Sequence, residues 1–96
     1  MPPAATLGSG TSHGTPLAPG PGSPNVLIGG KPAWRASIEF HSCPVATPNP
    51  HVGGMVTIGS TTVIINNVPA VRQGDMIIET GSLNTIIQGE PTVLIG

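Results

Sequence analysis

The sequence predicts an all-β domain made of short strands and tight turns, and three observations lead to this fold class. The chain of 96 residues contains fourteen glycines and twelve prolines, which break helices and favour turns. Its valines, isoleucines and leucines fall in short clusters with no helical spacing. An internal repeat connects these clusters to the turns. Such a glycine and proline content often marks disorder, but discrete aliphatic clusters and a mean hydropathy of +0.23 favour a folded body.

The internal repeat relates residues 22–35 to residues 59–72 without gaps, with seven of fourteen positions identical. Each copy begins with a Gly-Ser turn, continues with an aliphatic run and reaches Gly-Gly at 29–30 or Asn-Asn at 66–67. Both pairs can adopt the positive φ of a tight hairpin turn. A weaker third copy is expected from Gly81 to Pro91, and residues 93–96 repeat residues 26–29 once more.

The segments before the Gly-Ser turns are predicted to supply partner strands. Residues 56–58 are expected to pair with 63–65, and residues 76–78 with 86–87, in strands of about four to six residues. The proline-rich segments 15–22 and 44–50 are expected to be stiff connectors or surface loops. We expect a single domain over residues 1–96 with almost no helix.

Charge and cysteine content exclude several function classes. The net charge is −1 and only three residues are Lys or Arg, so neither nucleic-acid binding nor polybasic membrane binding is expected. One cysteine cannot form an internal disulfide. The N-terminus has no basic region followed by an apolar run, and no stretch is long enough to span a membrane. We therefore expect a soluble protein made in the cytoplasm.

All the histidines and the one cysteine point to a metal site. They are His13, His41, Cys43 and His51. We predict that these four side chains surround one structural Zn²⁺, because four N/S ligands without an open position are typical of structural zinc. The spacing matches no zinc-finger pattern, so an exposed loop histidine at 13, a buried thiol at 43 and a solvated histidine at 51 remain the alternative. The repeat favours the metal, since it places His13 and the 41/43 pair at comparable points of successive units.

A proline-alanine motif follows each Gly-Ser unit. Pro-Ala-Trp-Arg at 32–35 and Pro-Ala-Val-Arg at 69–72 are joined by Pro-Ala-Ala-Thr at 3–6. Ten residues after Pro3 stands His13, nine and eleven after Pro32 stand His41 and Cys43, and ten after Pro69 stands Glu79. Three units that each return to one point suggest pseudo-threefold symmetry about an axis through the metal.

With these motifs the chain resembles the PAAR-repeat family, named for proline-alanine-alanine-arginine, over residues 3–96. The resemblance implies a small conical, β-rich domain whose point carries a zinc bound by three histidines and one cysteine, here His13, His41, His51 and Cys43. It also implies that the broad base caps a trimeric spike, the valine-glycine-repeat protein of type VI secretion systems. The base strands near 26–28, 63–65 and 93–95 would contact this spike, one tip per trimer, and the free chain would be a monomer.

The resemblance leaves alternatives for the role. Related cones cap phage tails and other contractile particles, and some could recruit effector toxins. The protein would move from the bacterial cytoplasm to the tip of the apparatus, and on firing it would be delivered outside the cell or into a target cell. No enzymatic activity is expected. A zinc hydrolase using Glu39, Glu79 or Glu90 as base, or a thiol protease pairing Cys43 with His41 or His51, is the less favoured interpretation.

The first motif departs from the others. Thr6 stands in place of arginine, and Ser9-Gly10 stand where Asp75-Met76 occur in another unit. An arginine and an aspartate could pair within one unit, so we interpret their joint loss as a coupled change that leaves the ligands untouched. Trp34, the one tryptophan, is expected to pack in the core or base.

Overall fold

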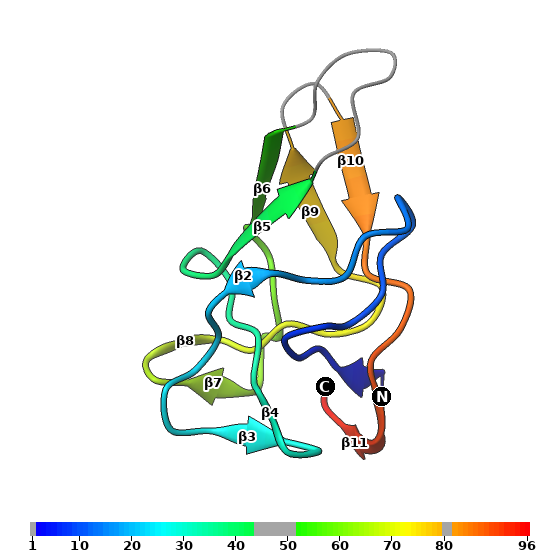
Figure 1. Ribbon diagram of the computed structural model, residues 1–96. Coiled ribbons are helices and arrows are strands. Elements are labelled where there is room, and N and C mark those ends of the chain that lie inside the picture. Colours follow the sequence, from blue (N-terminus) through cyan, green and yellow to red (C-terminus); the bar gives the residue numbers. More distant parts are fainter. Residues whose placement is uncertain (1, 44–51, 80–81) are drawn as a thin grey trace.

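The computed structural model describes residues 2–43, 52–79 and 82–96 (Figure 1). Within these ranges the chain forms eleven β-strands and no helix, which confirms the predicted fold class. The described residues therefore contain no helix that could span a membrane. The molecule measures 35 × 23 × 21 Å along its principal axes.

A five-stranded antiparallel sheet forms the narrower part of the molecule, in the order β10-β9-β6-β5-β2. Its strands are β2 (Pro19–Gly20), β5 (Phe40–Cys43), β6 (Val52–Val56), β9 (Met76–Glu79) and β10 (Ser82–Thr85). The central β6–β9 pair joins strands distant in sequence. Val56 lies opposite Ile77 there, and both side chains are fully buried. Burial of this apolar pair therefore fixes the central register.

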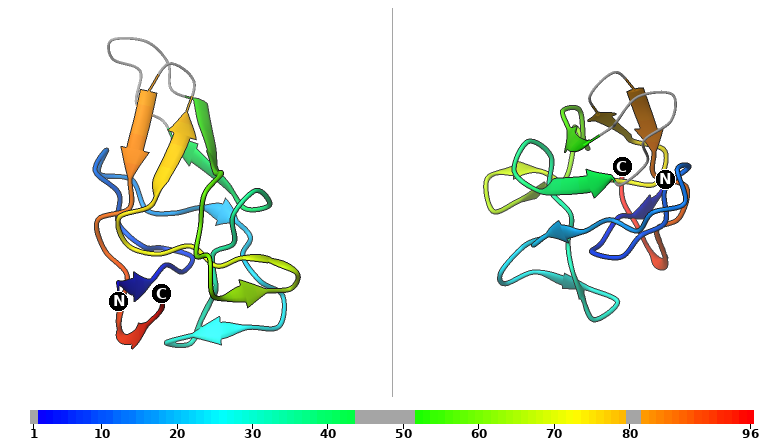
Figure 2. Two further views of the ribbon diagram at one scale, coloured as in Figure 1. Left: turned by 180° about the vertical axis from the view of Figure 1, so that it is seen from behind. Right: turned by 45° about the horizontal axis from the view of Figure 1, so that its top comes forward.

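Three two-stranded sheets form the broad end, and the domain tapers from them toward the five-stranded sheet (Figures 1 and 2). They pair β3 (Leu27–Ile28) with β4 (Lys31–Pro32), β7 (Ile64–Ile65) with β8 (Val68–Pro69), and β1 (Pro3–Ala4) with β11 (Glu90–Leu94). The predicted turns are confirmed, because Gly29, Gly30, Asn66 and Asn67 all have positive φ.

The predicted strand partners are wrong in two places. Residues 64–65 pair with β8 and not with 56–58, because the two-residue Asn66-Asn67 turn closes a local hairpin at once. Residues 76–78 pair with 83–85 of β10, in place of 86–87. The strands also have two to five residues, shorter than predicted.

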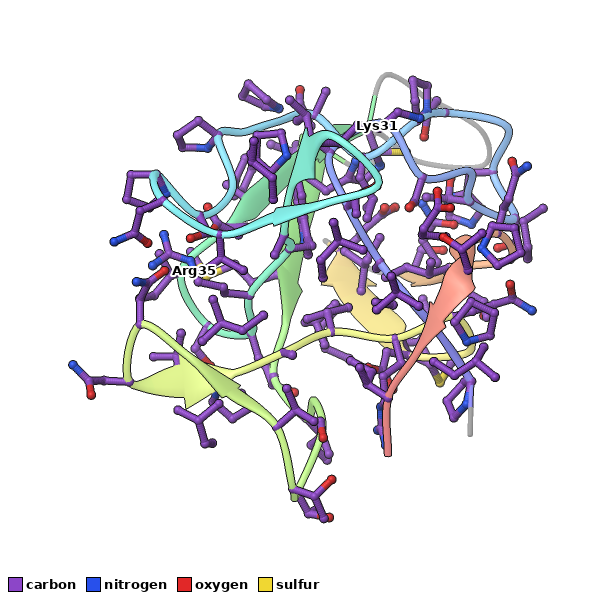
Figure 3. All side chains as sticks on the ribbon, turned by 90° about the horizontal axis from the view of Figure 1, so that it is seen from below. Lys31 and Arg35 are labelled. Carbon is purple, nitrogen blue, oxygen red and sulfur yellow. The ribbon has the colours of Figure 1, made fainter. Side chains whose placement is uncertain are left out.

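The third copy of the repeat starts at Gly89, and the prediction that it starts at Gly81 is wrong. Leu94 lies opposite Pro3, as Leu27 lies opposite Pro32 and Ile64 opposite Pro69. The N-terminal Pro-Ala motif thus completes a unit whose first strand comes from the C-terminal end of the sequence. Seen from below, the three pairs lie around the base (Figure 3).

Backbone hydrogen bonds link the three motifs in a closed ring. The N–H of Ala5 donates to the carbonyl oxygen of Val71 at 2.9 Å, that of Val71 to Trp34 at 3.1 Å, and that of Trp34 to Ala5 at 3.0 Å. All three residues are 1% exposed, which confirms the core position predicted for Trp34. The same contact repeated three times is what the predicted pseudo-threefold arrangement requires.

Each position of the motif has a physical reason in this ring. The proline carbonyls accept a second cycle of bonds, from Leu7 to Pro32, Ala36 to Pro69 and Gln73 to Pro3. The alanine that follows each motif proline is at most 1% exposed, and all three belong to the cluster of Ala4, Ala33, Ile65, Ala70 and Ile95. A larger side chain would hold the three backbones apart. A second cluster, which includes Val56 and Ile77 of the five-stranded sheet, contains Ala5, Leu17, Trp34, Ala36, Val56, Val71, Ile77 and Ile86.

Candidate metal centre

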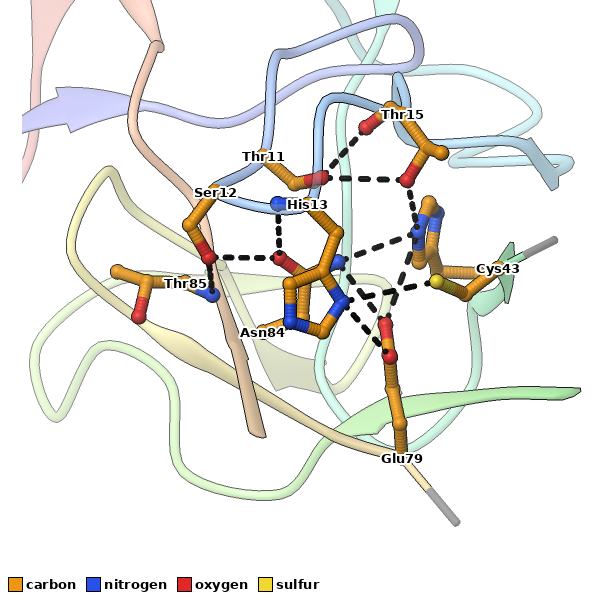
Figure 4. A network of polar contacts seen from close by, with 9 residues as sticks. Thr11, Ser12, His13, Thr15, Cys43, Glu79, Asn84 and Thr85 are labelled. Carbon is orange, nitrogen blue, oxygen red and sulfur yellow. Dashed lines mark hydrogen bonds and ion pairs between the residues drawn. The ribbon is translucent and has the colours of Figure 1, made fainter. Parts of the chain in front are cut away.

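Three separate segments bring polar side chains together beside the five-stranded sheet (Figure 4). The first is the loop around His13. The second is β5, where alternating burial turns both His41 and Cys43 inward. The third is β9, where the same alternation turns Glu79 inward beside Ile77. Strand periodicity therefore places residues two apart on the same interior face.

Three potential metal donors lie close together in this place. His13 Nδ1 is 3.6 Å from Cys43 Sγ and 3.2 Å from Glu79 Oε1. The donor atoms of all three residues lie within 4.8 Å of one another. Zinc bonds of about 2.0 Å to N or O and about 2.3 Å to S place ligands of a tetrahedron roughly 3.3–3.6 Å apart. The two measured separations are close to these values, so the donor set fits one cation.

The contacts of His13 Nδ1 differ from those of a histidine in a thiol-protease triad. A triad histidine uses one ring nitrogen for the nucleophile and the other for the orienting acid. Here Cys43 and Glu79 both approach Nδ1 of His13. Two electron-rich groups around one nitrogen are what a shared metal would bring together.

Asn84, a fully buried side chain on β10, connects the loop to the sheet. Its Nδ2 donates to Glu79 Oε2 at 2.9 Å, and its Oδ1 accepts from the His13 N–H at 3.1 Å and from Ser12 Oγ at 3.0 Å. Ser12 Oγ in turn accepts from the Thr85 N–H. One amide therefore fixes both His13 and Glu79 (Figure 4).

His41 belongs to the same network but lies outside the three-donor group. Its Nε2 is 3.1 Å from Thr15 Oγ1 and 3.8 Å from Glu79 Oε2, and the residue is fully buried. Burial lowers the pKa of the imidazole; Glu79 acts to raise it and His13 to lower it further. The neutral form that this direction favours is the form that binds metals.

The structure describes three of the four predicted ligands. The structure brings His13 and Cys43 together and puts His41 beside them, while His51 lies outside the described residues. The sequence prediction did not count Glu79 as a ligand. A signal was present, because Glu79 stands ten residues after Pro69, as His13 stands ten after Pro3.

The other two candidate carboxylates lie elsewhere. Glu39 is fully buried against Arg35, with its carboxylate accepting from Arg35 Nε at 2.5 Å and from the Gly22 N–H at 2.9 Å. Glu90 lies on β11 at the base. Neither can act as a base at the metal centre, and Glu79 faces the donors as a potential ligand.

Comparison with known proteins gives one family. The family model described as the PAAR motif matches residues 46–96, more than half of the chain. Neither the curated proteins nor the solved structures gave a match to this chain.

Proposed function

The chain belongs to the PAAR-motif family, and we propose that it is the tip protein of a contractile injection spike. In this role the narrow end enters the target first, and the broad end sits on a trimeric spike. The role is structural. The convergence of His13, Cys43 and Glu79 from three separate segments is the observation that carries the proposal.

A metal suits the narrow end for a physical reason. A tapering point cannot enclose much apolar surface, and the residues that meet there are polar. A structural zinc supplies binding free energy on the order of 10 kcal/mol, coupled to folding. We propose Zn²⁺ with His13 and Cys43 as ligands, joined by His41 and His51 from the sequence pattern, and Glu79 as a further candidate donor.

The base offers a surface that suits a threefold partner. Leu27, Ile64 and Leu94 occupy the same position in the three strand pairs, opposite the three motif prolines. They are 62%, 59% and 50% exposed, respectively. Three equivalent aliphatic side chains around the base could each meet one subunit of a trimer. This supports the whole chain, residues 1–96, acting as one cap per trimer.

We propose the valine-glycine-repeat spike of a type VI secretion system as the partner. The phage-tail or extracellular-particle alternative uses the same base and differs only in the spike. The chain would act in the bacterial cytoplasm before assembly and at the tip afterwards. Recruitment of effector toxins stays a prediction.

Binding to candidate spike trimers tests the proposal. The purified chain is mixed with each trimer, and the mass of the complex is measured by light scattering. A complex of one chain with three spike subunits is expected, and Leu27→Asp should weaken it at least tenfold. Thr57→Asp, an exposed site away from the base strands, serves as the control. Failure of every spike trimer to bind, or equal binding by Leu27→Asp, would reject the base as the docking surface.

A further inference from the structure

A polar pocket of about 140 Å³ lies between the first motif and the last strand. It is lined by Thr6, Gly8, Ser9, Lys31, Gln88, Gly89, Glu90 and Pro91. A water molecule occupies about 30 Å³ in the liquid, so the pocket has room for a larger group. The equivalent positions in the other two units of the domain indicate which chemical group would fit there.

In those units, an arginine side chain fills the corresponding space. Arg35 Nη2 donates to the Gly22 carbonyl at 3.5 Å, and Arg72 Nη2 donates to the Gly59 carbonyl at 3.3 Å. Each guanidinium also pairs with an acid of its own unit, Glu39 or Asp75. A guanidinium therefore lies twice between a carboxylate and a glycine carbonyl.

The backbone around the pocket repeats these surroundings. Thr6 forms an isolated bridge with Ala33, as Arg35 does with Ala70 and Arg72 with Ala4. The Thr6 N–H donates to Ser9 Oγ at 3.0 Å, in the way that the Arg72 N–H donates to Asp75 Oδ2 at 2.7 Å. Thr6 and Ser9 are thus the counterparts of the arginine and its acid.

The wall of the pocket at Gly89 also has counterparts in the other two units. A Cβ added to Gly89 would meet Pro3 Cβ and the Ala4 carbonyl, each at 2.8 Å. A Cβ on Gly22 would meet Pro32 and the Ala33 carbonyl, and one on Gly59 would meet Pro69 and the Ala70 carbonyl. The Gly89 carbonyl is therefore the third equivalent of the two that accept from arginine, and Thr6 is too short to reach it.

The walls are rich in hydrogen-bond acceptors. The lining residues include two that carry hydroxyls (Thr6 and Ser9), one side-chain amide (Gln88) and one carboxylate (Glu90), with Lys31 as the one basic wall residue. A guanidinium has five N–H donors in a plane and no acceptor, so it complements such a site better than an anion or a neutral amide would.

We propose that this pocket binds a guanidinium, supplied by an arginine side chain of the spike protein that docks on the base. The pocket is next to β4 and β11, two of the base strands, which places it beside that partner. This step rests on the base docking proposed above. The pocket makes one third of the base different from the other two, so one arginine of a threefold spike would enter it while the other two subunits meet positions that Arg35 and Arg72 already fill.

The first experiment tests the pocket without any spike. Methylguanidinium is titrated into the ¹⁵N-labelled chain, and shifts of the Gly8, Ser9, Gly89 and Glu90 amides are followed by NMR. Saturable shifts confined to these amides are expected. They should disappear in Thr6→Arg, whose own side chain fills the space, and Glu90→Gln should weaken binding about threefold to fivefold. Arg72→Ala, which opens the same space in another unit, is the matched control and should gain a second site.

Two results would overturn the site. One is the absence of shifts at the four amides at concentrations that saturate the Arg72→Ala site. The other is binding unchanged in both Thr6→Arg and Glu90→Gln. The Glu90→Gln variant changes no buried contact, so the test does not depend on how Thr6→Arg folds.

The second experiment tests the source of the guanidinium. Thr6→Arg and wild type are compared for binding to the spike trimer, with Leu27→Asp as the reference for base docking. Loss of binding at least tenfold in Thr6→Arg is expected. Unchanged binding, with methylguanidinium still bound by the wild-type chain, would reject the spike arginine and assign the pocket to a small guanidinium compound. No spike binding by wild type rejects the base docking and with it the spike as the source, while the NMR result still decides the pocket.

Discussion

The backbone N–H of Trp34 donates to the carbonyl oxygen of Ala5 at 3.0 Å, although a long stretch of chain separates the two residues. This bond is one of the three that close the ring between the motifs. It joins the N-terminal unit to the middle one and puts the motif alanines in the centre of the base cluster. The small size of alanine at that point is therefore a requirement of the ring.

Enlarging a central alanine should destabilise the domain. Ala70, at 1% exposure, belongs to the same buried cluster as Ala4 and Ala33, so added methyl groups would have to displace packed neighbours. We expect Ala70→Val to lower the free energy of unfolding by about 1–3 kcal/mol, as overpacking does elsewhere. Urea denaturation measures the change. Thr61→Val, an exposed substitution of similar character, is the control; an equal effect at both sites would contradict the ring as the reason for alanine.

Removing the thiol should remove the metal. Cys43 Sγ faces His13 Nδ1, and the thiolate is a strong zinc ligand. We expect about one zinc per wild-type chain by mass spectrometry of protein purified without a tag, and a large loss of both zinc and thermal stability in Cys43→Ser. Ser42→Ala, on the exposed face of the same strand, should keep both. One zinc per chain in Cys43→Ser would move the site elsewhere.

The carboxylate of Glu79 should contribute to metal affinity. It lies 3.2 Å from His13 Nδ1, within reach of the same ion. We expect Glu79→Gln to weaken zinc binding about 10- to 100-fold, the range found when groups around a metal are altered. Competition with a chelator of known affinity measures it, and Co²⁺ absorption reports the ligand geometry. Glu90→Gln, at the base, provides the comparison; equal affinities would show that Glu79 is only a neighbour.

Asn84 should hold the site in shape. Loss of its amide leaves the Glu79 carboxylate and the His13 N–H without their Asn84 contacts in a buried place, at a cost of about 1–3 kcal/mol. We expect Asn84→Ala to lose this much stability by thermal unfolding. Zinc affinity should also fall, which would not happen if Asn84 only stabilised the fold without positioning the metal ligands. Thr85→Ala, a neighbour whose backbone alone joins the network, should change neither.

The two acid–arginine pairs should differ in strength. The Arg35 and Glu39 side chains are 11% and 0% exposed, whereas the Arg72 and Asp75 side chains are 22% and 9% exposed. Breaking a buried pair leaves an uncompensated charge, so Glu39→Ala should cost about 3–5 kcal/mol. Asp75→Ala should cost about 1 kcal/mol, since water replaces part of the lost contact. Equal losses in parallel urea titrations would contradict the burial argument.

The sequence by itself determined the local parts of this protein. Glycine and asparagine pairs set the turns at 29–30 and 66–67, because their backbone tolerates positive φ. The gapless repeat identified the Pro-Ala motifs and the joint change at Thr6 and Ser9, although both strand partnerships predicted from the sequence were wrong. The three histidines and the cysteine led to the prediction of a metal site, because few other residues of the chain could serve as metal ligands.

Only the tertiary structure decided the contacts between distant segments. The third unit is completed by β1 and β11 from opposite ends of the sequence, a pairing that no local pattern encodes. The β6–β9 register depends on Val56 and Ile77 being buried together. Glu79 joins His13 and Cys43 because β9 turns it inward at the level of the loop. Turn geometry acts within a few residues of the chain, whereas these contacts depend on burial and hydrogen bonding across the whole fold.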